Sequence, residues 1–237
     1  MIGVDISHHA LELACQNRSI YKRRPENQVN ILKLENPTRQ QRSNISFYQA
    51  DILANNGDER MQSLQPGKDD ALHCMKNPTF NESFHLVNGR FKKGVEVLIS
   101  NPPYISPSSY RRETARSVRD FEPKLALVPP ESQPGHDLGD SFYPRLIELT
   151  DQLSVKMALF EVADMAQATR VVAMALDGLP PDYSVEIWRD EPSQPIIEEV
   201  SVAGKRVRVV GEGNGRSVFI QREGAQMGLE RELVARE

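Results

Sequence analysis

The chain has 237 residues, enough for one α/β domain with a substantial core, and its formal net charge is −4 at pH 7. This mildly acidic balance argues against a protein whose main partner is a nucleic acid backbone, because such domains usually carry a basic excess. No run of about 18 apolar residues occurs, so the sequence predicts no membrane span. The two cysteines, Cys15 and Cys74, predict reduced thiols in an intracellular compartment.

The first residues, 1–7, predict a strand that ends in an acidic residue, Asp5. Residues 8–17 follow with helical spacing, and Ser7 is the expected N-cap of that helix. In nucleotide-binding sheets, a carboxylate at such a strand end accepts hydrogen bonds from ribose hydroxyls. An ordinary acidic residue before a helix, stabilised by the helix dipole, is the alternative interpretation of Asp5.

The polar stretch 18–43 predicts a solvated connection, with a basic loop that touches RNA as the alternative. Residues 45–49 alternate between apolar and polar side chains, which predicts the next strand. Asp51 and Ile52 come shortly after this strand, where a helix or turn cap is one interpretation of Asp51. Residues 54–94 show no periodicity and several turn signals, which predicts a flexible insertion.

Potential metal ligands within the insertion are His73, Cys74 and His85. Their spacing does not match a zinc site, and the sequence offers no clear fourth ligand. We therefore expect no metal site in this protein.

The segment Val95 to Ile99 is rich in β-branched residues and predicts a strand buried on both faces, as in a parallel sheet. Asn101-Pro102-Pro103-Tyr104 follows and ends the strand, because two prolines remove two backbone donors and force an extended exit. Ligands of open α/β sheets bind beyond the carboxyl ends of the strands. Asn101 and Tyr104 are therefore expected to lie at the edge of a site.

This tetrapeptide has the groups that a planar –NH2 substrate requires. The Asn101 side chain offers a carbonyl acceptor, and the Pro102 carbonyl is a second acceptor whose geometry is fixed by the next proline. Tyr104 supplies a flat face for a planar amide or base. The pattern predicts alkylation of an amide or exocyclic amine nitrogen without a strong base. A strand followed by an ordinary Pro-Pro turn is the alternative.

The stretch after Tyr104, residues 105–139, predicts a loop over this site with a short helix at 108–119. That helix carries Arg111, Arg112, Arg116 and Arg119. Arginine pairs well with carboxylates or phosphates, which suits an acidic or RNA-associated partner. A solvated helix face with an internal bridge from Arg119 to Glu122 is the alternative.

The rest of the chain continues the alternation of helices and strands. We expect a helix over 140–151, a strand over 155–160 ending at Glu161, a helix over 163–176, a strand over 183–188, a hairpin around 203–205, a hairpin turn at 211–215, a last strand over 216–221 and a charged helix over 224–237.

Two motifs resemble a known family. Asn-Pro-Pro-Tyr after such a strand resembles the signature of the S-adenosylmethionine-dependent amino-methyltransferases, which include N6-adenine DNA methyltransferases and release-factor glutamine methyltransferases. Residues 117–127, Ser-Val-Arg-Asp-Phe-Glu-Pro-Lys-Leu-Ala-Leu, closely resemble the V-R-x-(F/Y)-E-P-x-x-A-L segment of the release-factor enzymes. The similarity runs, with gaps, from residue 1 to about residue 221.

This resemblance implies a Rossmann-like class I methyltransferase fold: a three-layer α/β sandwich over residues 1–222, with a mostly parallel sheet and a C-terminal antiparallel hairpin, before a charged tail at 223–237. It implies that the cofactor is S-adenosylmethionine. The ribose would be held by Asp5, with Asp51 near the adenine and Ile52 packed on its ring. The resemblance implies that the substrate is bound by Asn101, Pro102, Pro103 and Tyr104. Of these four residues, it implies that Asn101, Pro102 and Tyr104 also act in catalysis. It implies that the cofactor is bound by Asp5, Asp51, Ile52 and Asn101.

The sequence departs from the family at several places. The family's first strand and glycine-rich cofactor loop should precede Asp5, so we expect a member that lacks its N-terminal helical domain, first strand and cofactor loop. After Glu161 the family has a glycine two residues on and a glutamine shortly after; here Ala163 takes the glycine position and Gln167 is displaced. The pair Gly215-Arg216 resembles the glycine and arginine near the family's last strand.

The expected activity is methyl transfer to the side-chain amide nitrogen of a glutamine in a class I peptide chain release factor. The resemblance implies a monomer that acts in mitochondria, or otherwise in the cytoplasm. One alternative is a nucleic-acid N6-adenine methyltransferase, since adenine N6 is also a planar –NH2. Another is a non-catalytic remnant that serves at most as an interaction partner.

Overall fold

The computed structural model describes residues 2–23, 46–49, 51–53, 75–76, 95–131 and 135–224. The chain divides into two compact units, Met1–Arg90 and Phe91–Glu237, and each is described by itself. The expected single methyltransferase domain over residues 1–222 extends across both units and stays a prediction.

Several sequence-based predictions concern residues outside the described ranges. Nearly all of the predicted insertion at 54–94 lies there, including His73, Cys74 and His85. The same holds for residues 225–237 of the predicted tail and for most of the polar stretch 18–43.

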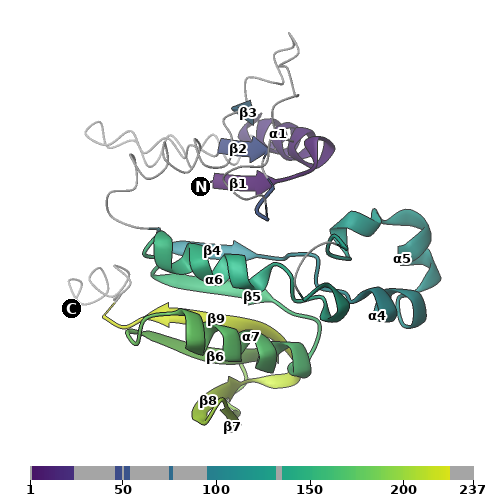
Figure 1. Ribbon diagram of the computed structural model, residues 1–237. Helices are drawn as coiled ribbons and strands as arrows, with labels where there is room; N and C mark the ends of the chain where they lie inside the picture. The colour runs from purple at the N-terminus through teal and green to yellow at the C-terminus, as the bar shows by residue number, and fades with distance from the viewer. Residues whose placement is uncertain are drawn as a thin grey trace, which may run out of the picture. The chain divides into compact units, whose positions relative to one another are not determined.

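Among the residues of unit 1 that the structure describes are a three-stranded parallel sheet and one helix (Figure 1). Its elements are β1 (Ile2–Asp5), α1 (His8–Arg23), β2 (Ser46–Gln49) and β3 (Met75–Lys76), with strand order β1-β2-β3. The predicted N-cap is confirmed, because the Ser7 Oγ accepts a hydrogen bond of 3.3 Å from the Ala10 backbone N–H. The helix continues six residues beyond the predicted end at Asn17, since the next helix-breaking residue is Pro25.

Unit 2 is built on a six-stranded mixed sheet of order β4-β5-β9-β6-β8-β7. Its strands are β4 (Val97–Ser100), β5 (Met157–Glu161), β6 (Tyr183–Glu191), β7 (Ile197–Val202), β8 (Lys205–Val210) and β9 (Glu212–Arg222). Strands β4, β5, β6 and β8 run in one direction, and β9 and β7 run in the other. The predicted mixed α/β architecture, with a mostly parallel sheet and additional antiparallel strands, is therefore present.

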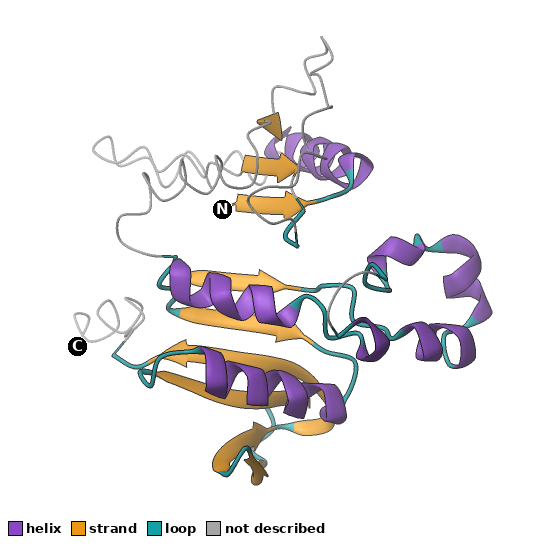
Figure 2. Cartoon of the chain, viewed as in Figure 1, coloured by secondary structure: helices purple, strands orange, loops and turns teal. Residues whose placement is uncertain are grey.

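Two helices, α6 (Tyr143–Gln152) and α7 (Met165–Gly178), pack on one face of this sheet (Figures 1 and 2). Their inward faces and the central strands form the core, which includes the fully buried Tyr143, Leu146, Phe160, Val171, Ile187 and Ile220. Burial of each large apolar side chain contributes roughly 1.5–3 kcal/mol. This packing holds the ends of β5 and the start of α7 in place.

The strand before the tetrapeptide is less buried than predicted. In β4 the exposed fractions of Val97 and Ile99 are 49% and 71%, so the prediction of burial on both faces is wrong. β4 lies at the edge of the described sheet of unit 2, with β5 as its neighbour, and its side chains alternate between exposed and half-buried. A run of β-branched residues favours a strand but does not reveal whether that strand is central.

The predicted hairpin around 203–205 is confirmed. Ala203 and Gly204 have positive φ values of 49° and 76° and connect β7 to β8, as a two-residue hairpin turn requires. The predicted hairpin turn at 211–215 is wrong, because β9 already begins at Glu212 and β6 lies between β8 and β9.

The predicted helix at 108–119 is two short helices, α4 (Pro107–Arg112) and α5 (Arg116–Phe121). The Glu113 and Thr114 N–H groups both donate to the Ser109 carbonyl, which ends α4. The alternative of an internal Arg-to-acid bridge is present with other partners, since Arg116 Nε donates to Asp120 Oδ2 at 3.2 Å. Arg119 does not bridge to Glu122 but donates from Nη1 to the Arg111 carbonyl, at 2.9 Å, and so connects the two helices. The 3-10 helices η3 (Lys124–Ala126) and η4 (His136–Leu138) complete this region.

Candidate functional site

The Asn-Pro-Pro-Tyr segment leaves the carboxyl end of β4, as predicted from the sequence. Pro102 is buried, Pro103 and Tyr104 are half-buried, and Asn101 is exposed. The next residue is fixed to the following loop, because the Ile105 N–H donates to the Leu127 carbonyl at 2.9 Å. Within the described ranges, no group hydrogen-bonds to the Asn101 side-chain amide, which leaves it open to a ligand.

Tyr104 is held by a residue of the neighbouring strand. Its hydroxyl donates a hydrogen bond of 2.8 Å to Glu161 Oε1, at the end of β5, which runs parallel to β4. Burial, the hydrogen bond to Glu161 and the charge of that carboxylate raise the pKa of Tyr104 to about 12. Tyr104 is therefore neutral at physiological pH and presents an uncharged aromatic ring.

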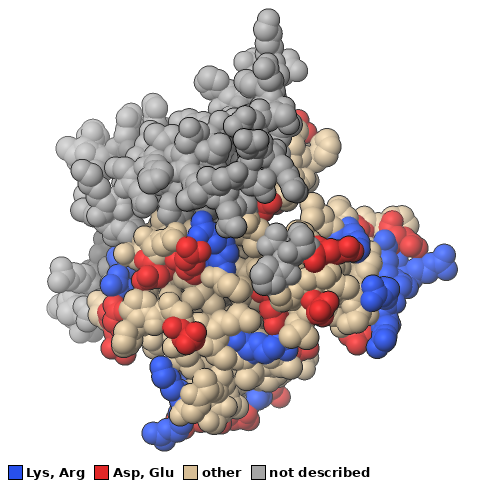
Figure 3. All heavy atoms as spheres, in the orientation of Figure 1, with Lys and Arg blue, Asp and Glu red and all other residues tan. Residues whose placement is uncertain are grey.

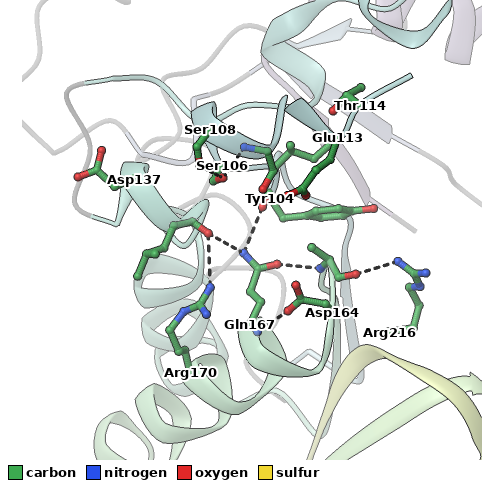
Figure 4. A pocket seen from close by; sticks show the side chains of 14 residues that line it. Tyr104, Ser106, Ser108, Glu113, Thr114, Asp137, Asp164, Gln167, Arg170 and Arg216 are labelled. Carbon is green, nitrogen blue, oxygen red and sulfur yellow. Dashed lines mark hydrogen bonds between the residues drawn. The ribbon is translucent and has the colours of Figure 1, made fainter. Parts of the chain in front are cut away.

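Gln167, in the first turn of α7, holds together the loops around Tyr104. It is 2% exposed, and its Nε2 donates to the carbonyls of Tyr104 and Gly139, both at 3.2 Å, and to Asp140 Oδ1 at 2.8 Å. Its Oε1 accepts from the Ala163 N–H at 2.8 Å. Figure 4 shows the amide between these segments. One side chain thus joins the loop after β4, the loop before α6 and the turn after β5.

The loop before α6 approaches Tyr104 very closely at Gly139. Gly139 has φ +78°, and a Cβ built on it would lie 2.1 Å from the Tyr104 carbonyl oxygen. The next residue, Asp140, is 2% exposed and receives hydrogen bonds from Arg170 Nε and Nη2 at 2.6 and 3.0 Å. This paired hydrogen bonding raises the pKa of Arg170 and anchors the loop to α7.

Arg216, near the start of β9, supports the turn after β5 from the other side. Its Nη1 donates to the Ala163 carbonyl at 3.1 Å and its Nε to Asp190 Oδ1 at 3.0 Å. The second oxygen of Asp190 accepts from the Asn214 N–H at 2.9 Å. The hydrogen bonds from Asn214 and Arg216 lower the pKa of Asp190.

An open pocket of about 560 Å³ lies between Tyr104, the α4 region and the start of α7 (Figure 4). Hydroxyl groups of Ser106, Ser108 and Thr114 and carboxylates of Glu113 and Asp137 line it, so its surface is polar. Tyr104 and Gln167 form part of its wall. A peptide or nucleotide segment that reaches the ring of Tyr104 has room in this pocket.

Three of the four predicted cofactor residues, Asp5, Asp51 and Ile52, belong to unit 1, and the fourth, Asn101, belongs to unit 2. Asp5 is paired with Gln49 across the parallel strands, and Asp51 follows two residues after Gln49, so both carboxylates are at the carboxyl edge of that sheet. Asp5 Oδ1 accepts from the Ser7 N–H at 2.7 Å, and Asp51 Oδ1 accepts from the Leu53 N–H at 2.9 Å. Half-buried Ile52 lies beside Asp51.

The predicted residues therefore fall in two groups: Asp5, Asp51 and Ile52 in unit 1, and the tetrapeptide, including the predicted cofactor residue Asn101, in unit 2. It adds Glu161, Gln167 and Gly139, which the sequence reasoning did not assign to the site. The sequence does indicate that Gln167 is buried, because this polar residue lies on the same apolar stripe of α7 as the buried Val171 and Ala175.

The described part of the chain contains no cluster of three or more His, Cys, Asp or Glu side chains suited to a metal ion. Among the helices that the structure describes, none has the length and apolar character needed to cross a membrane. No protein-family model matches the chain, and no curated protein matches it.

Proposed function

We propose that this chain is an S-adenosylmethionine-dependent methyltransferase that methylates the side-chain amide nitrogen of a glutamine in a peptide chain release factor. The observation that carries the proposal is the Asn-Pro-Pro-Tyr segment at the carboxyl end of β4, with the Asn101 amide exposed and Tyr104 held as a neutral ring. The resemblance of residues 117–127 to the release-factor enzymes selects a glutamine amide over other planar –NH2 groups. The proposal includes a Rossmann-like class I methyltransferase fold, with which the mixed sheet is compatible.

The proposed chemistry depends on orientation. The Asn101 side-chain carbonyl and the Pro102 carbonyl would accept the two N–H groups of the substrate amide, and Tyr104 would pack against its plane. When bound, S-adenosylmethionine would supply an electrophilic methyl group. The amide nitrogen would form a bond to that carbon as the sulfur–methyl bond breaks, S-adenosylhomocysteine would leave with the electron pair, and the nitrogen would lose its proton to water. An amide nitrogen is a poor nucleophile, so most of the rate enhancement would come from alignment and electrostatic placement.

The residues at the edge of the unit 1 sheet fit a nucleoside. Asp5 and Asp51 each use Oδ1 in a local turn. In the described residues Oδ2 of each accepts no hydrogen bond, which leaves it open to a hydroxyl or amino donor. Ile52 beside Asp51 offers an apolar surface for a base. These features support the proposed roles of the three residues in holding the cofactor.

Asn101→Ala tests the proposal directly. We expect it to abolish methyl transfer to the release factor while the affinity for S-adenosylmethionine stays within a few-fold of wild type, because the nucleoside is assigned to unit 1. Transfer of labelled methyl groups and calorimetric titration with the cofactor measure the two quantities. Unchanged turnover in Asn101→Ala would contradict the proposed role of Asn101 and with it the proposed methyltransferase activity.

A nucleic-acid N6-adenine methyltransferase is the second candidate. Lys and Arg side chains gather over α4 and α5 (Figure 3), and Arg111, Arg112, Arg116 and Arg119 are all exposed near the pocket. Phosphates pair well with such side chains. The same methyl-transfer assay with DNA and RNA in place of release factor separates the two candidates. A chain that does not bind the cofactor at all would instead be a non-catalytic interaction module.

A further inference from the structure

We infer that Gln167 is a positioning residue whose buried amide sets the pose of the Tyr104 loop and, through it, the orientation of the acceptor amide. The identity of the acceptor amide rests on the proposed function. The control of the Tyr104 loop rests on the hydrogen bonds of Gln167. It assigns a functional role to a residue of α7 that lies outside the Asn-Pro-Pro-Tyr segment.

The surroundings of the Gln167 amide demand a donor. Its Nε2 faces four oxygens: the carbonyls of Tyr104, Leu138 and Gly139 at 3.2, 3.4 and 3.2 Å, and Asp140 Oδ1 at 2.8 Å. Arg170 Nη2 also donates to Asp140 Oδ1 and to the Leu138 carbonyl, at 3.0 and 3.4 Å. Loss of the amide hydrogens would therefore chiefly affect the carbonyls of Tyr104 and Gly139, and a buried polar group that loses its hydrogen bond is costly. A carboxylate of the same shape at position 167 would reverse the polarity of this contact.

Gln167 and Glu161 hold Tyr104 at two points. The Gln167 amide binds its backbone carbonyl and the Glu161 carboxylate binds its hydroxyl, so both the start and the tip of the residue are fixed. The absence of a side chain at Gly139 allows the loop before α6 to pack on the same carbonyl. The Tyr104 carbonyl belongs to the peptide that joins Tyr104 to Ile105, whose N–H donates to the Leu127 carbonyl at 2.9 Å. Loss of the Gln167 contact therefore leaves that peptide, which follows the tetrapeptide directly, with one of its two hydrogen bonds.

A displacement of Tyr104 is transmitted to the acceptor groups. Pro102 and Pro103 connect Tyr104 to Asn101, and the ring of each proline fixes φ, so the segment has little freedom to absorb a shift. Methyl transfer is sensitive to such shifts, since misplacement by about 1 Å can lower a rate by about 10²-fold. Gln167 thus influences the reaction without contact with the substrate amide.

The test compares Gln167→Glu and Gln167→Met with Thr169→Ala, all on α7. Thr169 is a matched control, because within the described ranges its hydroxyl bonds to the Met165 carbonyl of the same helix, at 2.8 Å, and to no other group. The full chain is labelled with 3-fluorotyrosine, and the Tyr104 signal in the fluorine NMR spectrum is assigned by its loss in Tyr104→Phe. Steady-state kinetics with release factor and S-adenosylmethionine give kcat and both KM values.

We expect the Tyr104 resonance to shift or broaden in both Gln167 variants and to stay in place in Thr169→Ala. We also expect kcat to fall about 10²-fold in the Gln167 variants, with KM for S-adenosylmethionine within about 2-fold, because the nucleoside is assigned to unit 1. Gln167→Met keeps the test decisive if Gln167→Glu does not fold. A wild-type kcat in folded Gln167→Met, or an unmoved Tyr104 resonance, would overturn the inference.

The fluorine spectrum does not depend on methyl transfer. If the wild type fails to methylate release factor but the Tyr104 resonance still responds to both Gln167 variants, the proposed substrate is rejected and the control of the Tyr104 pose by Gln167 is supported.

Discussion

At Gly139 the main chain comes so close to Tyr104 that no side chain can be accommodated. A Cβ there would lie 2.1 Å from the Tyr104 carbonyl oxygen, and the backbone has φ +78°. Both the φ value and the collision oppose any other residue. Gly139 is therefore part of the geometry of the site, although it carries no functional group.

Gly139→Ala should destabilise the protein by roughly 2–4 kcal/mol, from the positive φ and from overpacking against a backbone oxygen. Urea denaturation measures the loss. Gly204→Ala is the matched control, because Gly204 has nearly the same φ, +76°, with nothing within 4 Å of the added Cβ. We expect Gly204→Ala to cost only about 1–2 kcal/mol. Equal losses in the two variants would show that the close approach to Tyr104 contributes nothing.

The raised pKa of Tyr104 has two separable causes. Burial is the larger, and the hydrogen bond and charge of Glu161 add to it, so Glu161→Gln should lower the pKa from about 12 while leaving it above the ordinary value of about 10. A titration followed by NMR of ¹³Cζ-labelled tyrosine measures this. A pKa of Tyr104 that does not move in Glu161→Gln would contradict the contribution of the Glu161 carboxylate, because glutamine keeps an acceptor but has no charge.

The same pKa predicts how stability depends on pH. Because folding raises the pKa of Tyr104 above its unfolded value of about 10, its protonated form stabilises the fold below that pH, and the contribution is lost as pH rises through about 12. We expect the free energy of unfolding to decline more steeply between these pH values in the wild type than in Tyr104→Phe, which has no titrating hydroxyl. If the free energy of unfolding falls equally steeply with pH in the wild type and in Tyr104→Phe, this contribution of Tyr104 is excluded.

At the scale of elements, the irregular start of β9 is fixed by one carboxylate of β6. The pairing of β6 with β9 shifts register around Arg189, and Asp190 fills the space beside Gly213, where a Cβ would lie 2.8 Å from Asp190 Oδ2. Asp190 also binds the Asn214 N–H and Arg216. This arrangement aims Arg216 at the turn after β5, and so connects the strand to the site.

Asp190→Ala should release this strand start. We expect the Asn214 amide to exchange with deuterium faster by at least about 10-fold, the factor that corresponds to about 1.4 kcal/mol in local opening. Asp182→Ala is the control, because Asp182 forms a comparable ion pair with Arg222 at the other end of β9, at 2.7 Å. Exchange of Asn214 that is equally fast in both variants would contradict a local role for Asp190.

The elements with strong local signals are those that the sequence predicts well. Periodic apolar residues predict α7 and β5, and Ala-Gly at 203–204 predicts the hairpin, because each depends on neighbouring residues only. The glycines at 211–215 led to the wrong prediction of a hairpin turn, because glycine suits an irregular strand as well as a turn. Which of the two forms here depends on β6, which is remote in sequence.

The same reason explains what the sequence missed at the site. The tetrapeptide is a contiguous motif, so its position at a strand end was predictable. The contacts of Gln167 with Tyr104 and of Glu161 with the Tyr104 hydroxyl join residues 63 and 57 positions apart. Such pairs follow from the parallel pairing of β4 with β5 and from the packing of α7. The spacing of residues along the chain reveals neither of these.

At the scale of the whole molecule, the proposed function divides between the two units. In the proposal, the acidic residues at the edge of the unit 1 sheet would bind nucleoside hydroxyls, whereas the tetrapeptide and pocket of unit 2 would bind the amide acceptor. Substitutions in the two units should consequently affect different steps. Cofactor affinity should respond to unit 1, and turnover with bound cofactor should respond to unit 2.

Asp5→Asn is the sharpest test of this division. The asparagine keeps an acceptor for the Ser7 N–H, now made by Asp5 Oδ1 at 2.7 Å, but loses the negative charge that a ribose hydroxyl would meet. A hydrogen bond to a charged group contributes about 1.5–3 kcal/mol, so the Kd for S-adenosylmethionine should rise about 10- to 100-fold by calorimetry. Asn101→Ala serves as the control, with a Kd within a few-fold of wild type. An unchanged Kd in Asp5→Asn would show that unit 1 does not hold the ribose, because the substitution leaves the turn and the fold of β1 intact.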